Sequence, residues 1–275
     1  MKRPPLVIRL IVYVLLVIIA VAINLPFFWM VITAFKNEAD VFSMPPKFYP
    51  TVYDFRNFVR AFQIVPIARY LVNTLFVAGS VTLLQLVFNT FAAYGLARIN
   101  FKGRNLIFLL IVGTLMVPPE VTLVPLYVLV RKMGMLNSFK ALIVPFMSNA
   151  FGVFLLRQFF LTIPKELEDA ARIDGCGRLR ILWNVILPLS KPALWTMALY
   201  TFLAHWNSYM WPLVAINNDQ KQMIQVGISK FASMWETEWT LQMASSTVAI
   251  VPIIIFFFFV QKQFVEGISI SGMKE

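Results

Sequence analysis

The segment Pro164-Lys-Glu-Leu-Glu-Asp-Ala-Ala-Arg-Ile-Asp-Gly175, which runs on to Ile186-Leu-Pro188, decides how the rest of the chain must fold. It is rich in acids and arginines, yet it belongs to a chain of 275 residues that is 59% hydrophobic. A stretch with so many charges cannot lie in lipid, because the charges would lose their hydration. It therefore lies on one side of a membrane, between helices that cross it.

The composition of the chain indicates an integral membrane protein. Its mean hydropathy is +0.75 and only 13% of its residues are charged, so it carries more apolar surface than a soluble domain of this length buries. The net charge of +11 comes from basic residues scattered between apolar runs. This scatter suits membrane topology, so we expect lipid and no nucleic acid as a partner.

The cysteine and histidine counts leave little room for a disulfide or a metal site. The single cysteine, Cys176, excludes an intrachain disulfide. Since there is only one histidine, a metal would need carboxylates for its other ligands. We therefore predict no metal site.

Six apolar runs are long enough to cross a membrane as helices, since about 20 helical residues cover the hydrocarbon core. They lie at residues 10–35, 71–97, 106–130, 141–160, 193–216 and 239–260. The first continues too far to be a signal peptide, so we expect it to be retained. The predicted fold class is all-α integral membrane, with a single transmembrane domain over residues 1–275.

Basic residues predict the orientation. Arg98, Lys102 and Arg104 lie in one short connection, and such clusters mark the cytoplasmic side. With an even number of spans, both termini are then cytoplasmic, and so are the 162–191 loop and the polar 261–275 tail.

Several of the predicted spans contain residues that a simple anchor does not need. Pro118-Pro119-Glu120 interrupts the third span, and the fifth combines aromatic and amide side chains that suit a sugar or polyol. Polar residues at membrane depth often face a solute pathway. The candidates are Asn73, Asn149, Trp206, Asn207 and Tyr209. Hydrogen bonding between helices, without solute contact, explains any one of them equally well.

The hydrophilic segment itself predicts two short helices joined by a glycine turn. Acids follow Pro164, as at a helix N-terminus, and Glu168 and Arg172 are spaced one turn apart. Gly175 permits a turn that a Cβ would resist. The second helix carries an apolar stripe of Leu179, Leu182, Trp183 and Ile186. An amphipathic connector lying on lipid headgroups fits the same pattern.

Asp169-Ala-Ala-Arg-Ile-Asp174-Gly175, followed by Ile186-Leu-Pro188, resembles the EAA signature of permease subunits of ABC importers. Matches to the maltose-type carbohydrate branch continue along the chain, among them Asn73-Thr-Leu75, Ala92-Ala-Tyr-Gly-Leu-Ala-Arg98 and Phe264-Val-Glu-Gly267. The resemblance implies a type I importer permease whose 162–191 loop contains a coupling helix. The residues it implies for docking on an ATP-binding subunit are Glu168, Asp169, Ala170, Ala171, Asp174, Gly175, Leu187 and Pro188.

One residue departs from the family pattern at the docking helix. Asp169 stands where this family usually has glutamate, so Glu168 is a candidate to take over part of the docking contact.

The same resemblance implies a function and a set of partners. The chain would carry a sugar or related polyol into the cytoplasm, as a multi-pass protein of a prokaryotic cytoplasmic membrane. Its partners would be a second, different permease subunit, two ATP-binding subunits and an extracytoplasmic solute-binding protein. A homodimeric pair and a glycerol-phosphate cargo both remain open.

The chain is not expected to be an enzyme. It has no Gly-x-x-x-x-Gly-Lys phosphate loop. ATP and Mg would therefore bind the partner subunits, and this chain would hold no cofactor.

The alternative function is a secondary transporter or channel that is driven by an ion gradient. It would use Glu120 and His205, two ionisable groups near membrane depth. Folds of that class often contain internal repeats with paired broken helices, and the sequence shows no convincing repeat.

Overall fold

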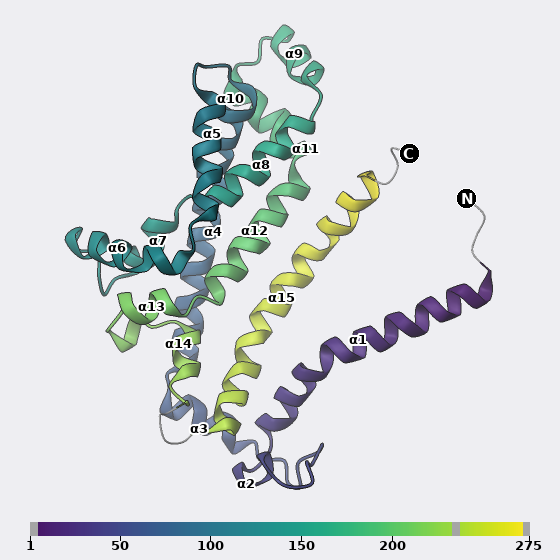
Figure 1. The fold of residues 1–275 in the computed structure, drawn as a ribbon, viewed down its shortest axis with the longest axis vertical. Coiled ribbons are helices and arrows are strands. Elements are labelled where there is room, and N and C mark those ends of the chain that lie inside the picture. Colours follow the sequence, from purple (N-terminus) through teal and green to yellow (C-terminus); the bar gives the residue numbers. More distant parts are fainter. Residues whose placement is uncertain (1–4, 233–236, 272–275) are drawn as a thin grey trace. The chain divides into compact units, whose positions relative to one another are not determined.

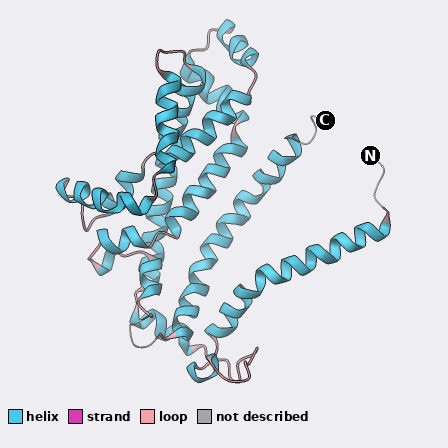
Figure 2. Cartoon of the chain, viewed as in Figure 1, coloured by secondary structure: helices cyan, strands magenta, loops and turns pink. Residues whose placement is uncertain are grey.

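The computed structural model describes residues 5–232 and 237–271, and within these ranges the chain forms helices and turns with no β-strand (Figures 1 and 2). The predicted all-α class is confirmed. The chain divides into two compact units, one of Met1–Ile67 with Gly227–Val251 and the other of Ala68–Val226 with Pro252–Glu275. The assignment of residues 1–275 to one transmembrane domain stays a prediction.

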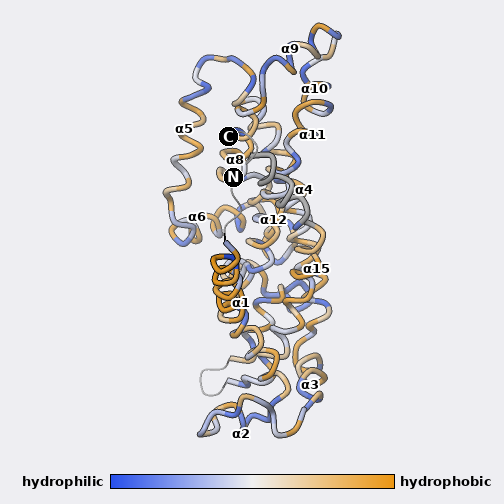
Figure 3. The backbone as a smooth tube through the Cα atoms, turned by 90° about the vertical axis from the view of Figure 1, so that its right-hand side faces the viewer, coloured by the Kyte–Doolittle hydropathy of each residue, from blue (hydrophilic) through white to orange (hydrophobic). Residues whose placement is uncertain are grey.

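The first unit begins with α1 (Leu6–Ala34), which is apolar along its length (Figure 3). Its mean hydropathy reaches 3.1 over an 18-residue window, and none of that window is buried within the chain. A helix that is hydrophobic on every side is stable only in an apolar surrounding. The helix therefore fits a retained membrane span, as the sequence predicts.

Polar contacts order the chain that follows α1. It contains α2 (Glu38–Val41) and α3 (Arg56–Ile64). The Asn57 amide donates to the carbonyls of Ala34 and Lys36 at 3.0 and 2.8 Å. The Glu38 carboxylate accepts from the Trp239 N–H at 2.9 Å and from the Thr240 hydroxyl at 2.7 Å. It thereby caps the first turn of α15 (Trp239–Ser271).

The Asp40 carboxylate gives this unit a testable dependence on pH. Hydrogen bonds from Lys47 and Thr51, at 2.6 and 2.5 Å, lower the pKa of Asp40 below its ordinary value of 3.8. A lowered pKa stabilises the fold above the ordinary pKa and ceases to do so as the pH falls through the lowered value. We expect Asp40→Asn to speed amide exchange over residues 38–54 at about pH 6, and the difference from wild type to shrink as the pH falls through the lowered pKa of Asp40.

Along the chain, the remaining helices are α4 (Ile67–Arg98), α5 (Arg104–Gly113), η1 (Thr114–Met116), α6 (Pro119–Lys132), α7 (Phe139–Ile143), η2 (Val144–Phe146), α8 (Ala150–Thr162), α9 (Lys165–Ile173), α10 (Arg178–Ile181), η3 (Leu182–Ile186), α11 (Leu187–Leu189), α12 (Lys191–Trp206), α13 (Met210–Ala215), η4 (Asp219–Lys221) and α14 (Ile224–Ser229). Four helical segments in the described part are long and apolar enough to cross a membrane: Leu6–Ala34, Ile67–Arg98, Phe139–Thr162 and Trp239–Phe259.

The third and fifth predicted spans are broken. Arg104–Met116 and Pro119–Lys132 form a pair bent by 103°, at the two prolines where the sequence predicts an interruption. In the fifth predicted span, over residues 193–216, α12 ends at Trp206 and α13 begins only at Met210. The Asn207 side chain bonds the Leu203 carbonyl at the helix end, and Pro212 lies just beyond the break. A count of six spans therefore stays a prediction.

One apolar core of the second unit joins the ends of α4 and α8 to η3 and α12. Its buried members include Ala93, Tyr94, Ala97, Leu156, Phe160, Ile181, Leu182, Ile186 and Met197. The alanines of α4 let neighbouring backbones approach closely, as in other membrane helix pairs. This core anchors the hydrophilic segment to the bundle.

Candidate functional site

The first helix of the hydrophilic segment, α9, ends in the glycine turn that the sequence predicts. Gly175 has φ +79°, in the left-handed region that side chains with a Cβ disfavour. The Cys176 N–H donates to the Ala171 carbonyl at 2.9 Å, and the Gly175 N–H donates to the Arg172 carbonyl at 2.9 Å. This pair of bonds is a Schellman motif, which fixes the direction in which the chain leaves α9.

Glu168, the buried residue of α9, forms an ion pair within the chain. Its carboxylate lies 2.7 Å from the Arg98 guanidinium, and both side chains are only 3% exposed. The predicted pairing with Arg172 is also present, at 3.7 Å. Glu168 therefore binds within the chain itself and is not on the surface that a docking partner would reach.

Arg98 extends this contact to a third helix. Its guanidinium donates to the carbonyls of Phe160 and Ile163, each at 2.6 Å, at the C-terminal end of α8. Carbonyls at a helix end have no partner within the helix, so a buried cation there is stabilising. One arginine thus holds the ends of α4 and α8 and the start of α9 together. Sequence reasoning missed this role, although an arginine in the last turn of a span was a signal for it.

The remaining residues expected to dock differ in their exposure. Asp169, Ala170, Asp174, Gly175 and Pro188 are exposed, whereas Ala171 and Leu187 are half-buried against the core. Ile173, which the sequence analysis did not single out, is 87% exposed.

The predicted apolar stripe of the second helix is buried only in part. Leu182 and Ile186 are fully buried, but Leu179 and Trp183 are 63% and 58% exposed. The stripe assumed 3.6 residues per turn, whereas residues Leu182–Ile186 form a π-helix with a wider turn. Leu179 and Trp183 are the exposed members of the predicted stripe, and Trp183 lines one apolar hollow together with Leu182.

Within the membrane segments, a buried polar network joins α4, the start of α8 and α12. The Asn149 amide and the Thr201 hydroxyl both donate to the Gln85 side-chain oxygen at 2.8 Å. The Ser148 hydroxyl donates to the Asn89 side-chain oxygen at 2.7 Å. Asn149 also caps α8 by accepting from the Gly152 N–H at 2.7 Å. Asn149 thus has the interhelical role that the sequence left open.

The other candidate pathway residues divide into two groups. Asn73 is buried and donates to the carbonyls of Gln220 and Gln222 at 3.0 and 2.9 Å. Trp206 is buried and stacks on Phe202. Asn207 and Tyr209 are exposed at the break between α12 and α13. Of the five, Asn207 and Tyr209 are the two whose side chains are exposed.

Glu120 and His205, which the alternative function needs, lie on different elements. Glu120 is exposed in the first turn of α6. His205, near the end of α12, packs edge-on against Phe146 with ring centroids 5.3 Å apart. No group of three or more histidine, cysteine, aspartate or glutamate side chains in the described ranges could hold a metal ion.

Gly152 leaves no room for a side chain inside the polar network. A Cβ there would lie 2.7 Å from the Asn149 side-chain oxygen, 2.8 Å from the Met197 sulfur and closer still to the Asn89 amide. We expect Gly152→Ala to lower the free energy of unfolding by about 1–3 kcal/mol through overpacking. Gly95→Ala is the matched control, since nothing lies within 4 Å of its Cβ position. It should be neutral or stabilising in the same thermal unfolding measurement in detergent.

Comparison with known proteins shows the class to which this helical membrane chain belongs. The model of the family "Binding-protein-dependent transport system inner membrane component" matches residues 85–270. This chain belongs to that family of ABC importer permeases, so the resemblance seen in the sequence is confirmed.

Two curated relatives and one solved structure extend the match over most of the chain. The arabinooligosaccharides transport system permease protein AraQ of Halalkalibacterium halodurans is 37% identical over 202 residues, covering 74% of this chain and 72% of AraQ. The sn-glycerol-3-phosphate transport system permease protein UgpE of Yersinia pestis is 31% identical, covering 93% and 94%. A chain of a bacterial ABC transporter that imports the acidic polysaccharide alginate superposes with a TM-score of 0.82 at 27% identity, covering 96% of this chain and all of that one.

Proposed function

We propose that this permease imports a sugar, an oligosaccharide or a related polyol solute into the cytoplasm, powered by ATP-binding subunits that dock on α9. The observation that carries the proposal is the clamp beneath this helix. Arg98 and Glu168, 2.7 Å apart, fix α9 to the ends of α4 and α8, while Ile173 points outward. A displayed helix that is rigidly tied to membrane helices suits the transmission of force.

The mechanism follows from that rigidity. ATP would bring two nucleotide-binding subunits together, and each would carry a docked helix with it. Because Arg98 ties α9 to the ends of α4 and α8, the motion would pass into the spans as a rigid-body change between two states. ATP and Mg would bind the partner subunits, and this chain would have no catalytic role of its own.

The cargo proposal rests on the relatives and on the broken fifth segment. AraQ and the alginate transporter are named for carbohydrate cargoes, and UgpE for a phosphorylated polyol. Asn207 and Tyr209 combine an amide with an aromatic ring at an exposed helix break. Such pairs stack on and hydrogen-bond sugar rings, which have apolar and polar faces. Among the possible cargoes, we therefore propose a carbohydrate ahead of a phosphorylated polyol.

The proposed assembly follows from the family. A second, different permease subunit would complete the pathway, and an extracytoplasmic solute-binding protein would deliver the solute. The complex would lie in the cytoplasmic membrane of a prokaryote, with both termini of this chain in the cytoplasm. The side chains of the predicted cytoplasmic tail lie outside the described part from residue 262 onward.

Co-purification tests the proposal. The chain, extracted in mild detergent from its own host, should bring down a protein that hydrolyses ATP. That protein should be lost when Asp169 and Gly175 are changed together and retained when Arg131→Gln is introduced at the end of α6. Solute uptake by liposomes that contain this chain alone, driven by a pH gradient, would instead support the secondary transporter that uses Glu120 and His205.

A further inference from the structure

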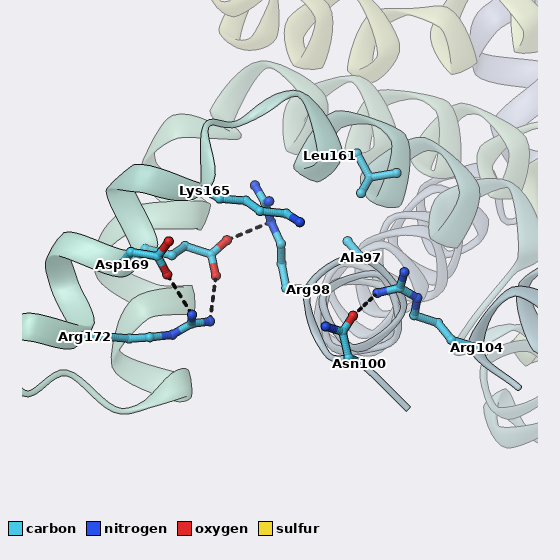
Figure 4. A pocket seen from close by; sticks show the side chains of 9 residues that line it. Ala97, Arg98, Asn100, Arg104, Leu161, Lys165, Asp169 and Arg172 are labelled. Atoms are coloured by element: carbon cyan, nitrogen blue, oxygen red, sulfur yellow. Dashed lines mark hydrogen bonds and ion pairs between the residues drawn. The ribbon is translucent and has the colours of Figure 1, made fainter. Parts of the chain in front are cut away.

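A polar cavity of about 210 Å³ lies between α9 and the ends of α4 and α8 (Figure 4). Four basic side chains line it, together with two acidic ones. The basic residues are Arg98, Arg104, Lys165 and Arg172, and the acidic residues are Glu168 and Asp169. The excess of positive charge makes the cavity a candidate site for an anion.

The two acids are already paired with two of these cations. The Glu168 carboxylate forms an ion pair with Arg98 at 2.7 Å, and Arg172 donates to the Asp169 carboxylate at 2.8 Å. Arg104 donates only to neutral oxygens, the side chain of Asn100 at 2.9 Å and the Ile99 carbonyl at 3.4 Å. Lys165 has no hydrogen-bond or ion-pair partner anywhere in the described ranges. Arg104 and Lys165 are therefore left without a counterion at one cavity.

A second hollow of about 230 Å³ adjoins the first and shares Asn100 and Arg104 with it. It is lined by the first residues of α5, whose N-cap Gly103 supplies no side-chain cap. The Arg104 N–H donates to the Phe101 carbonyl at 3.4 Å, and the positive end of the helix dipole adds to the attraction that Arg104 and Lys165 exert on an anion.

The position of the two hollows indicates the source of the anion. They lie where the span Ile67–Arg98 ends and the apolar helix that starts at Arg104 begins, which is the level of the lipid headgroups. The adjoining face of α5 is apolar and open, with Leu106, Leu109 and Leu110 each at least 60% exposed. An anionic headgroup could enter the cavity while its acyl chains lie along this helix.

We propose that the cavity binds the phosphate of an anionic phospholipid headgroup, with Arg104 and Lys165 as its charged contacts. Basic pockets between membrane helices on the cytoplasmic side are suited to such headgroups. The bound lipid would bridge the α4–α5 turn and α9, and would thereby link the coupling loop to the composition of the membrane. Inorganic phosphate offers the same chemistry without the acyl chains.

Native mass spectrometry of the full chain tests the site. The chain is released from detergent that contains equal amounts of phosphatidylglycerol and phosphatidylcholine. We expect wild type to retain phosphatidylglycerol in preference to phosphatidylcholine. The double variant Arg104→Gln/Lys165→Gln should bind phosphatidylglycerol about thirtyfold more weakly, because it lacks two basic residues that each attract an anionic headgroup. The control, Arg131→Gln/Lys132→Gln, removes the same charge outside the cavity and should match wild type.

Three results would overturn the proposal. The first is retention of phosphatidylglycerol by the double variant at the wild-type level, and the second is equal retention of both lipids by wild type. The third is displacement of phosphatidylglycerol by inorganic phosphate at the concentration of the lipid, which would assign the cavity to a free anion. If the chain alone retains neither lipid, the two lipids are retained equally, which is the second result. That outcome would favour an acidic segment of a partner subunit as the occupant of the cavity.

Discussion

Replacing Glu168 with alanine is expected to destabilise the second unit by roughly 3–5 kcal/mol, because it leaves Arg98 charged and buried without its counterion. Both side chains are 3% exposed, so solvent screens their interaction little. The loss would also free α9 from the ends of α4 and α8. We therefore expect a large fall in the thermal unfolding temperature and faster amide exchange across residues 165–173.

Two further variants make this expectation specific. Asp169→Ala removes an acid from the same helix, but its carboxylate is 60% exposed and pairs with the half-exposed Arg172, so its loss should cost less than about 1 kcal/mol. Removing both charges, with Arg98→Met and Glu168→Met together, should recover part of the stability lost in the single variant. Equal effects of Glu168→Ala and Asp169→Ala would show that the buried pair does not hold α9.

Replacing Gly175 with valine is expected to uncouple ATP hydrolysis from uptake. Valine at φ +79° carries a strain of about 1–2 kcal/mol and resists the left-handed conformation, so the Schellman bonds at the end of α9 would be lost. The direction in which the chain enters α10 would then change. Proteoliposomes with the whole complex should hydrolyse ATP yet accumulate little solute.

Gly177 provides the matched control for this variant. It lies two residues away, and a Cβ at either glycine would meet nothing within 4 Å. Its φ is −72°, which any residue adopts. The amount of solute taken up per ATP hydrolysed should therefore stay close to the wild-type value in Gly177→Val. Equal uptake ratios for the two variants would show that the left-handed turn plays no part in coupling.

Local signals in the sequence predict the elements of this loop correctly. The acids after Pro164, the spacing of Glu168 and Arg172 and the glycine at 175 each depend on neighbours within one or two turns. The paired prolines at 118–119 likewise predict the break in the third span, since a proline disrupts a helix wherever it lies. Composition alone is enough for the membrane class and for the helical fold.

Properties that depend on distant partners could not be predicted in the same way. Glu168 is buried because Arg98, seventy positions earlier, reaches it, and no local pattern shows that contact. Asn149 caps α8 and also belongs to a hydrogen-bond network that includes Thr201. The π-helical turn at residues 182–186 changes which side chains are buried, although the sequence there reads as an ordinary apolar stripe.

Crosslinking from α9 tests the central claim, that an ATPase drives this permease through the 162–191 loop. A photoreactive group is attached at Ile173→Cys, in a Cys176→Ser background that removes the single native thiol. Met210→Cys, an exposed position at the start of α13, serves as the control. In membranes containing the whole complex, Ile173 should capture a subunit that binds ATP, and Met210 should not. Capture of no such subunit from Ile173, or equal capture from both positions, would contradict the account.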